Sequence, residues 1–153
     1  MTHKKDTPSF EKGQSMVEFA TSMVIIVILL AGIVDLGRAL FTYMSLRDAA
    51  QEGALYGSVN PPESPLDTDR IDAIEARVFN SSNMLRDLEN APGHPVNVTV
   101  TVLGSPCMGN RLEVRVNYDD FPITMPFLGT MIGTQTVGIR ASVIENILIP
   151  ACP

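Results

Sequence analysis

The sequence predicts an α+β protein: a long N-terminal helix, transmembrane in its first half, and a small head with one helix packed on a three-stranded antiparallel sheet. Residues 19–34 form an apolar run without a charge, and a proline-free helical pattern continues from it to about residue 56. After residue 95 the apolar residues recur with a period of about 2 instead of about 3.6. The 153 residues suffice for one small domain and an appendage.

Charge is distributed unevenly along the chain, whose formal net charge is −6. The three lysines lie within the first 12 residues, and the rest of the chain carries eight arginines against fifteen acids. A basic stub before an apolar run indicates an N-terminus on the cytoplasmic side of a membrane and a head on the other side. The acidic body argues against a nucleic-acid partner, because binding to phosphates needs a basic surface.

The run from Phe19 to Val34 predicts a membrane span. As a helix its 16 residues extend for about 24 Å, slightly less than the roughly 30 Å hydrocarbon core of a bilayer. A cleaved secretory signal has a shorter apolar region and a small-residue cleavage site. Here an apolar helical stripe continues beyond the run, at Leu36, Leu40, Tyr43, Leu46, Ala50 and Ala54. We therefore expect one helix over residues 14–57, ended by the glycine and prolines of residues 57–65.

The head is expected to occupy residues 58–153. A second helix is predicted over residues 69–90, with Asp67 or Thr68 as its N-cap, and the poor helix formers of "NSSN" leave a break open at residues 80–83. Alternating apolar and polar residues predict strands over 96–102, 111–118 and 136–144. An unusually apolar loop, with room for a short helix, joins the second strand to the third.

A motif begins at Gly13, which follows the basic leader of residues 1–13. Glu18 stands five residues after that glycine, and the apolar helix follows, which is the signature of a prepilin. The blocks "GQSMVEFA", "DLGRA" and "EGALYGS" come in this order within residues 13–57. This segment closely resembles the TadE-like minor pilins and pseudopilins of the tight-adherence (Flp-type) branch of type IV pilus systems. The resemblance is weaker over residues 110–145, and Leu55 stands where the family often has arginine.

The resemblance implies a processing site and an assembly site. A prepilin peptidase would cut after Gly13 and leave a free amine on Gln14. Glu18 and Phe19 would then serve assembly, with the Glu18 carboxylate paired to the amine of a neighbouring subunit. A charge in the bilayer costs roughly 2.5–3.5 kcal/mol, which favours such a pairing. The alternative is that Glu18 only reaches the headgroups at the edge of a signal anchor.

Asp35 and Arg38 lie just after the apolar run. A pair three residues apart on a helix can form an ion pair, which here would mark the membrane boundary and contribute little to stability. An inter-subunit contact in a helix bundle is the other interpretation, and we favour the first.

Two cysteines in an exported domain favour a disulfide. Cys107 lies in the turn between the first two predicted strands, and Cys152 follows the third. In an antiparallel meander these positions lie at the same end of the sheet. A bond between them would close a loop of about 45 residues and stabilise the head by roughly 4 kcal/mol in the chain-entropy model. Two unpaired thiols are the alternative in a reducing compartment.

The sequence contains no catalytic triad order, nucleotide fingerprint or metal-ligand spacing, so we expect no enzyme, no cofactor, no metal and no small-molecule substrate. The resemblance implies a structural subunit of a tight-adherence pilus or of its initiation or tip complex. Its partners would be the membrane, the prepilin peptidase and other pilin subunits. It would reside in the cytoplasmic membrane as a single-pass protein, and at the cell surface once assembled. A signal-anchored protein whose head binds a ligand or partner without polymerising is the alternative.

Overall fold

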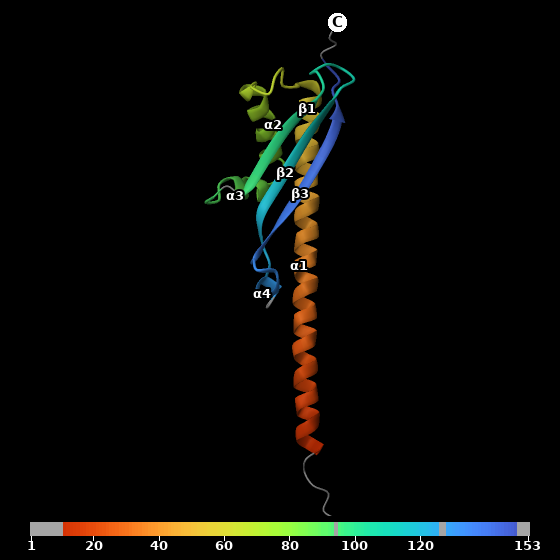
Figure 1. The fold of residues 1–153 in the computed structure, drawn as a ribbon, viewed down its shortest axis with the longest axis vertical. Coiled ribbons are helices and arrows are strands. Elements are labelled where there is room, and N and C mark those ends of the chain that lie inside the picture. The colour runs from red at the N-terminus through yellow and green to blue at the C-terminus, as the bar shows by residue number, and fades with distance from the viewer. Residues whose placement is uncertain (1–10, 94, 126–127, 150–153) are drawn as a thin grey trace, which may run out of the picture.

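The computed structural model describes residues 11–93, 95–125 and 128–149. Its dominant element is the helix α1 (Glu11–Val59), which is 49 residues long and therefore extends for about 74 Å. Figure 1 shows the first half of α1 projecting away from the rest of the protein. The helix is continuous through Gly32 and Gly37, a point that the sequence left open.

The head contains a three-stranded antiparallel sheet, as predicted. Its strands β1 (Val96–Leu103), β2 (Arg111–Pro122) and β3 (Thr136–Asn146) lie side by side in chain order. Val100 pairs with Val114, which pairs with Val143, so the apolar residues of the three strands align on one face. The second and third strands are longer than the alternating patterns indicated.

A register shift explains the greater length of β2. Tyr118 pairs with Ile139, whereas Phe121 pairs with Val137, so β2 has one extra residue between the two pairs. An extra residue reverses the side of the sheet to which the following residues point. Phe121 is consequently buried, at 5% exposure. It lies on the same face of the sheet as the buried residues Leu112, Val114 and Val116.

The predicted second helix is divided into two, at the break in residues 80–83 that the sequence left open. Helix α2 (Thr68–Asn80) has Asp67 as its N-cap, and α3 (Asn83–Glu89) has Ser82. The Ser82 backbone is extended, and its hydroxyl accepts a hydrogen bond from the N–H of Leu85 at 3.2 Å. The residues "NSSN" are poor helix formers, and the N-cap of Ser82 stabilises the start of the new helix α3 after them.

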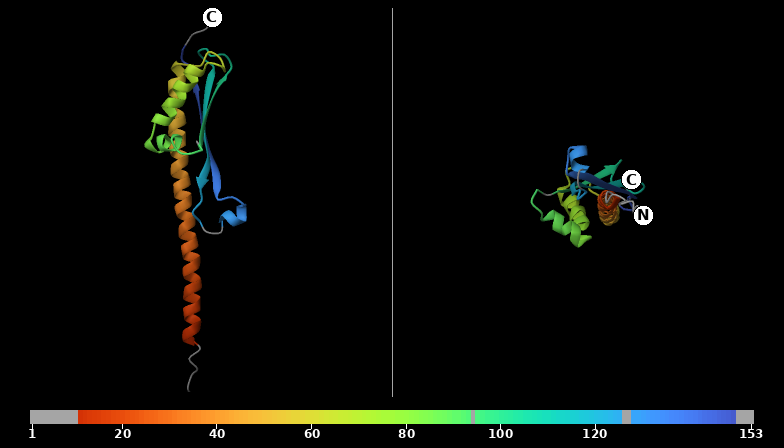
Figure 2. Two further views of the ribbon diagram at one scale, coloured as in Figure 1. Left: turned by 90° about the vertical axis from the view of Figure 1, so that its left-hand side faces the viewer. Right: turned by 90° about the horizontal axis from the view of Figure 1, so that it is seen from below.

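The C-terminal part of α1 is the central helix of the head. Seen along its axis, α1 lies beside α2 on one face of the sheet (Figure 2, right). The fully buried core includes residues of α1, α2, α3 and β2: Leu46, Ala49, Ala50, Ala54, Ile74, Val78, Leu85, Leu112, Val114 and Val116. The head therefore buries its sheet largely against α1, and the expected division at residues 57 and 58 cuts through this core.

Two glycines allow the close packing of α1. A Cβ at Gly53 would lie 2.6 Å from Cγ2 of Val78, and one at Gly57 would clash with the side chain of Leu112. Neither position has room for a side chain. The "EGALYG" block is thus accounted for by contact between α1, α2 and β2, despite the lower helix propensity of glycine.

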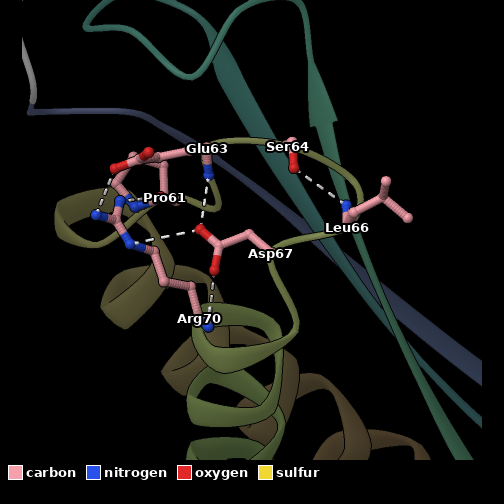
Figure 3. Close-up of polar contacts among 6 residues, drawn as sticks. All are labelled: Pro61, Glu63, Ser64, Leu66, Asp67 and Arg70. Carbon is pink, nitrogen blue, oxygen red and sulfur yellow. Dashed lines mark hydrogen bonds and ion pairs between the residues drawn. The ribbon is translucent and has the colours of Figure 1, made fainter.

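Arg70 organises the proline-rich loop between α1 and α2 (Figure 3). Its guanidinium donates to the carbonyl of Pro61 at 2.7 Å and to Glu63 Oε1 at 2.8 Å. The Asp67 carboxylate accepts from the N–H of Glu63 at 3.0 Å and caps α2. The loop is held in place at the end of the head farthest from the start of α1, and Leu66 on it is 87% exposed.

Candidate assembly site and helix–head junction

The predicted processing site lies in the first turn of α1. Gly13 is the third residue of the helix, and a Cβ built on it meets nothing within 4 Å. The first four N–H groups of a helix lack intrahelical acceptors, so this turn opens at little cost. Gly13 and Gln14 are both exposed. Access to the bond between them requires the opening of one turn and no change in the head.

Glu18 and Phe19 lie about one turn further along the exposed part of α1. The Glu18 carboxylate accepts a hydrogen bond from the side-chain amide of Gln14 at 3.3 Å. A neutral amide partly satisfies a carboxylate but does not neutralise its charge. Phe19 is 69% exposed. The two predicted assembly residues therefore face the surroundings of the helix, and processing would create an amine at Gln14, one turn away from Glu18.

The first half of α1 has an exposed apolar surface on all sides. Within the described residues this helix is the one long and apolar enough to cross a membrane, with a mean hydropathy of 2.5 over its best window. The core helix of a soluble protein can have the same composition, but no residue of this window is buried. The apolar surface therefore needs a cover that the subunit itself does not provide, and the helix suggests membrane anchoring.

Asp35 fastens α1 to the segment that follows β2. Its Oδ2 accepts hydrogen bonds from the backbone N–H groups of Thr124 at 2.8 Å and Met125 at 2.6 Å. Arg38 Nη1 lies 3.4 Å from Asp35 Oδ1 and also donates to Thr124 Oγ1 at 2.6 Å. Asp35 is 8% exposed. The sequence indicated a pair between Asp35 and Arg38 but missed its attachment to the head.

These contacts determine the ionisation of Asp35. Burial acts to raise the pKa of its carboxyl, but the N–H of Met125, the hydroxyl and N–H of Thr124 and the charge of Arg38 act in the opposite direction. The net pKa lies below its ordinary value because the donors favour the charged form. Asp35 is therefore a carboxylate at neutral pH.

Aromatic residues of β2 complete the junction. The Arg38 guanidinium lies 5.4 Å from the ring centroid of Phe121, and the rings of Tyr118 and Phe121 meet edge to face at 6.2 Å. A cation over an aromatic face gains about 0.5–1 kcal/mol at an exposed site. The blocks "DLGR" on α1 and "YDDFPITM" after residue 117 thus meet in space. The family match covers only the first of these two blocks.

The predicted disulfide is only partly within the described residues, since Cys152 lies outside them. Cys107 lies in the turn between β1 and β2, where its carbonyl accepts from the N–H of Asn110 at 3.1 Å. Ile147, just after β3, donates its N–H to the carbonyl of Asn110 at 2.8 Å. The chain therefore leaves β3 beside the turn that holds Cys107. The pairing itself stays a prediction.

The described residues contain no group of three or more His, Cys, Asp or Glu side chains that could hold a metal ion. A groove of about 530 Å³ beside the junction is lined mainly by apolar side chains, with Arg38 and Tyr118 as its titratable residues. This lining has no acid–base pair and suits aliphatic groups.

Comparison with known proteins identifies one family. The family model described as TadE-like protein matches residues 13–55. No curated protein and no solved structure gives a significant match. The matched segment runs from the predicted processing site, through the apolar surface and Asp35, to the part of α1 buried in the head. TadE-like proteins are a structural, pilus-associated family and not an enzymatic one. Residues 13–55 are thus similar to the TadE-like family, and the match and the apolar helix together fit a membrane protein associated with tight-adherence pili.

Proposed function

We propose that this protein is a minor pilin or pseudopilin of a tight-adherence pilus system. It inserts in the cytoplasmic membrane with its N-terminus inside and its head outside, and a prepilin peptidase cleaves it after Gly13. It then leaves the bilayer through packing of α1 against other pilin subunits in the pilus or in its initiation or tip complex. A minor role is favoured over bulk fibre because the head is large, at about 95 residues, whereas major pilins of this branch are very short.

The uncovered apolar half of α1 carries this proposal. Met16, Leu30 and Val34 are each more than half exposed, and so are most of the large apolar residues between them. Lipid covers this surface before assembly, and the helices of neighbouring subunits cover it afterwards. The other half of α1 is fixed in the core of the head, so the head moves with the helix as one body. A subunit of this kind enters a filament without unfolding.

Glu18 supplies the driving force for assembly in this proposal. Its carboxylate has a neutral amide contact in the single subunit. A charged group in the bilayer is stabilised by a partner of opposite charge, and cleavage creates an amine on Gln14 of each subunit. An amine from a neighbouring subunit can neutralise Glu18, which favours the bundle over the isolated helix.

Mass spectrometry of the mature protein tests the processing step. We expect an N-terminus at Gln14, and substitution of Gly13 by a larger residue should leave the uncleaved chain in the membrane. An intact N-terminus in the wild-type protein, in cells with an active prepilin peptidase, contradicts the proposal. It would favour a signal-anchored protein whose head acts without polymerising.

The substitution Glu18→Ala tests assembly. We expect the variant to insert in the membrane normally but to disappear from the sheared pilus fraction and from cross-links with other pilins. Glu52→Ala is the matched control, because Glu52 is an exposed acid on the same helix beyond the apolar half. Equal incorporation of Glu18→Ala and the wild type would rule out the proposed role of Glu18.

A further inference from the structure

Of the connection between β2 and β3, residues 124 and 125 lie beside the membrane half of α1. Figure 2 (left) shows this connection and its short helix α4 (Leu128–Ile132) extending sideways from α1, well below the main part of the head. Met125 Sδ lies 3.5 Å from the position of a Cβ on Gly32, within the predicted span. Gly32 lies about 4.5 Å before Asp35 along the helix axis. The connection therefore reaches to the membrane side of the first charge after the span.

The depth of this contact corresponds to the outer boundary of a bilayer. The span of about 24 Å is shorter than a hydrocarbon core of roughly 30 Å, so the boundary extends to about Asp35 when the core is centred on the span. A carboxylate at this depth needs donors. Asp35 has them in the N–H groups of Thr124 and Met125, both supplied by the connection.

The chemistry of the connection suits a lipid surface. Residues 121–135 contain no charged residue and no histidine. Met131, on α4, is 84% exposed, so this large apolar side chain points away from the protein. The nearest charged residues along the chain, Asp120 and Arg140, belong to the strands. An apolar, uncharged element at this depth can enter the headgroup region without desolvating a charge.

We propose that α4, through Met131, inserts in the outer leaflet of the membrane that α1 spans. This inference rests on the proposed insertion of α1. It gives the subunit a second attachment to lipid, to one side of the helix, which holds the head at a defined height and rotation before assembly. Because Asp35 anchors the connection to α1, departure from the bilayer withdraws both elements together.

Tryptophan fluorescence can test this inference, because the chain contains no tryptophan. The variant Met131→Trp is reconstituted in phosphatidylcholine vesicles that contain lipids brominated near the headgroup end of the acyl chains. Leu66→Trp is the matched control, since Leu66 is 87% exposed at the far end of the head. Ile26→Trp reports on insertion of the span itself. We expect quenching of Met131→Trp by the shallow bromines, no quenching of Leu66→Trp, and the strongest quenching of Ile26→Trp when the bromines are deep.

The three variants separate the failure of each proposal. Quenching of Ile26→Trp without quenching of Met131→Trp overturns the insertion of α4 and leaves the membrane insertion of α1 intact. A blue-shifted but unquenched Met131→Trp also overturns it, because a neighbouring protein and not lipid would then cover this residue. An unquenched Ile26→Trp shows that α1 does not insert, and both proposals fail.

A second measurement uses the native methionine and avoids any effect of the tryptophan itself. Where no lipid covers them, Met131 should be oxidised at least as fast as Met108, because their exposed fractions are 84% and 59%. In vesicles we expect the reverse order with a water-soluble oxidant, since lipid shields Met131 while Met108 lies in the distal turn between β1 and β2. An unchanged order would overturn the inference.

Discussion

The Asp35 carboxylate on α1 accepts a 2.6 Å hydrogen bond from the backbone N–H of Met125, ninety residues later in the chain. The contact joins the end of the apolar run to the lower end of the head. It is also short and charge-assisted, and such bonds are about twice as strong as neutral ones. The core packing of α1 fixes the position of the head, and this carboxylate fixes the segment after β2 against the helix.

The substitution Asp35→Asn should release the segment after β2 from α1. Both backbone N–H groups donate to Oδ2, and an amide oxygen can still accept them, but without the charge these bonds are weaker. The amide nitrogen replaces Oδ1, which faces Arg38, so the ion pair is lost. We expect faster hydrogen–deuterium exchange at the amides of Thr124 and Met125, without a change in the centre of the sheet. Asp48→Asn, at an exposed position of α1, is the control and should leave these amides unaffected. Equal exchange in Asp35→Asn and the wild type would contradict the role of the junction.

The stabilisation by Asp35 should depend on pH. The folded-state pKa of its carboxyl lies below the ordinary value of 3.8, so the stabilisation is present above that value and is lost as the pH falls through the folded-state pKa. We expect the difference in thermal midpoint between the wild type and Asp35→Asn to be largest at neutral pH and to shrink below pH 3.8. A difference that stays constant into strong acid would mean that the charge of Asp35 does not contribute.

Glu75 on α2 should show the opposite dependence. Partial burial and the nearby Asp72 raise the pKa of its carboxyl above 4.5, so the charged form is disfavoured in the folded state. Glu75→Gln should therefore raise the thermal midpoint at neutral pH, and the gain should vanish as the pH falls below 4.5. Thermal scans monitored by circular dichroism at several pH values check this. A loss of stability at neutral pH in Glu75→Gln would contradict it.

The substitution Gly53→Ala should destabilise the head, although alanine is the better helix former. The new Cβ would lie 2.6 Å from Cγ2 of Val78, whose β-branched side chain has few alternative rotamers. Overpacking costs about 1–3 kcal/mol, and the gain in helix propensity is about 1 kcal/mol. Gly37→Ala is the matched control, because nothing lies within 4 Å of its Cβ position. Denaturant unfolding in detergent should show a lower free energy of unfolding for Gly53→Ala and no loss for Gly37→Ala.

The substitution Asp67→Ala should loosen the proline-rich loop and the start of α2 together. Asp67 caps the helix and also accepts the N–H of Glu63. Loss of an N-cap costs about 0.5–2 kcal/mol. We expect a decrease of this size in the free energy of unfolding, together with proteolytic cleavage between residues 60 and 67. Asp67→Asn retains a capping oxygen and should behave much more like the wild type. If both variants match the wild type, the loop does not depend on this carboxylate.

Local patterns in the sequence were sufficient for the long helix and the three strands, but not for the bulge that lengthens β2. The charge-free run predicts a helix because a helix satisfies its own backbone hydrogen bonds in lipid, and the proline-free pattern after the run predicts its continuation. The alternating apolar residues predict three strands because side chains on a strand alternate between faces. The break at Ser82 was the weakest point of these predictions. A helix can either continue through this residue or end and start again with the Ser82 hydroxyl as N-cap. The two outcomes are close in free energy, so the local sequence does not decide between them.

The sequence by itself determined the order of α1 and the three strands, the apolar half of α1, the similarity of residues 13–55 to the TadE-like family, and the places of Gly13 and Glu18 along the helix. These properties follow from composition and spacing over a few turns. Only the tertiary structure decided that α1 is also the central helix of the head, that Gly53 and Gly57 are contact surfaces, and that Asp35 binds the N–H groups of Thr124 and Met125. The reason is physical: such contacts join residues far apart in the chain, and they depend on the register of the sheet and its rotation around α1, which no local pattern specifies.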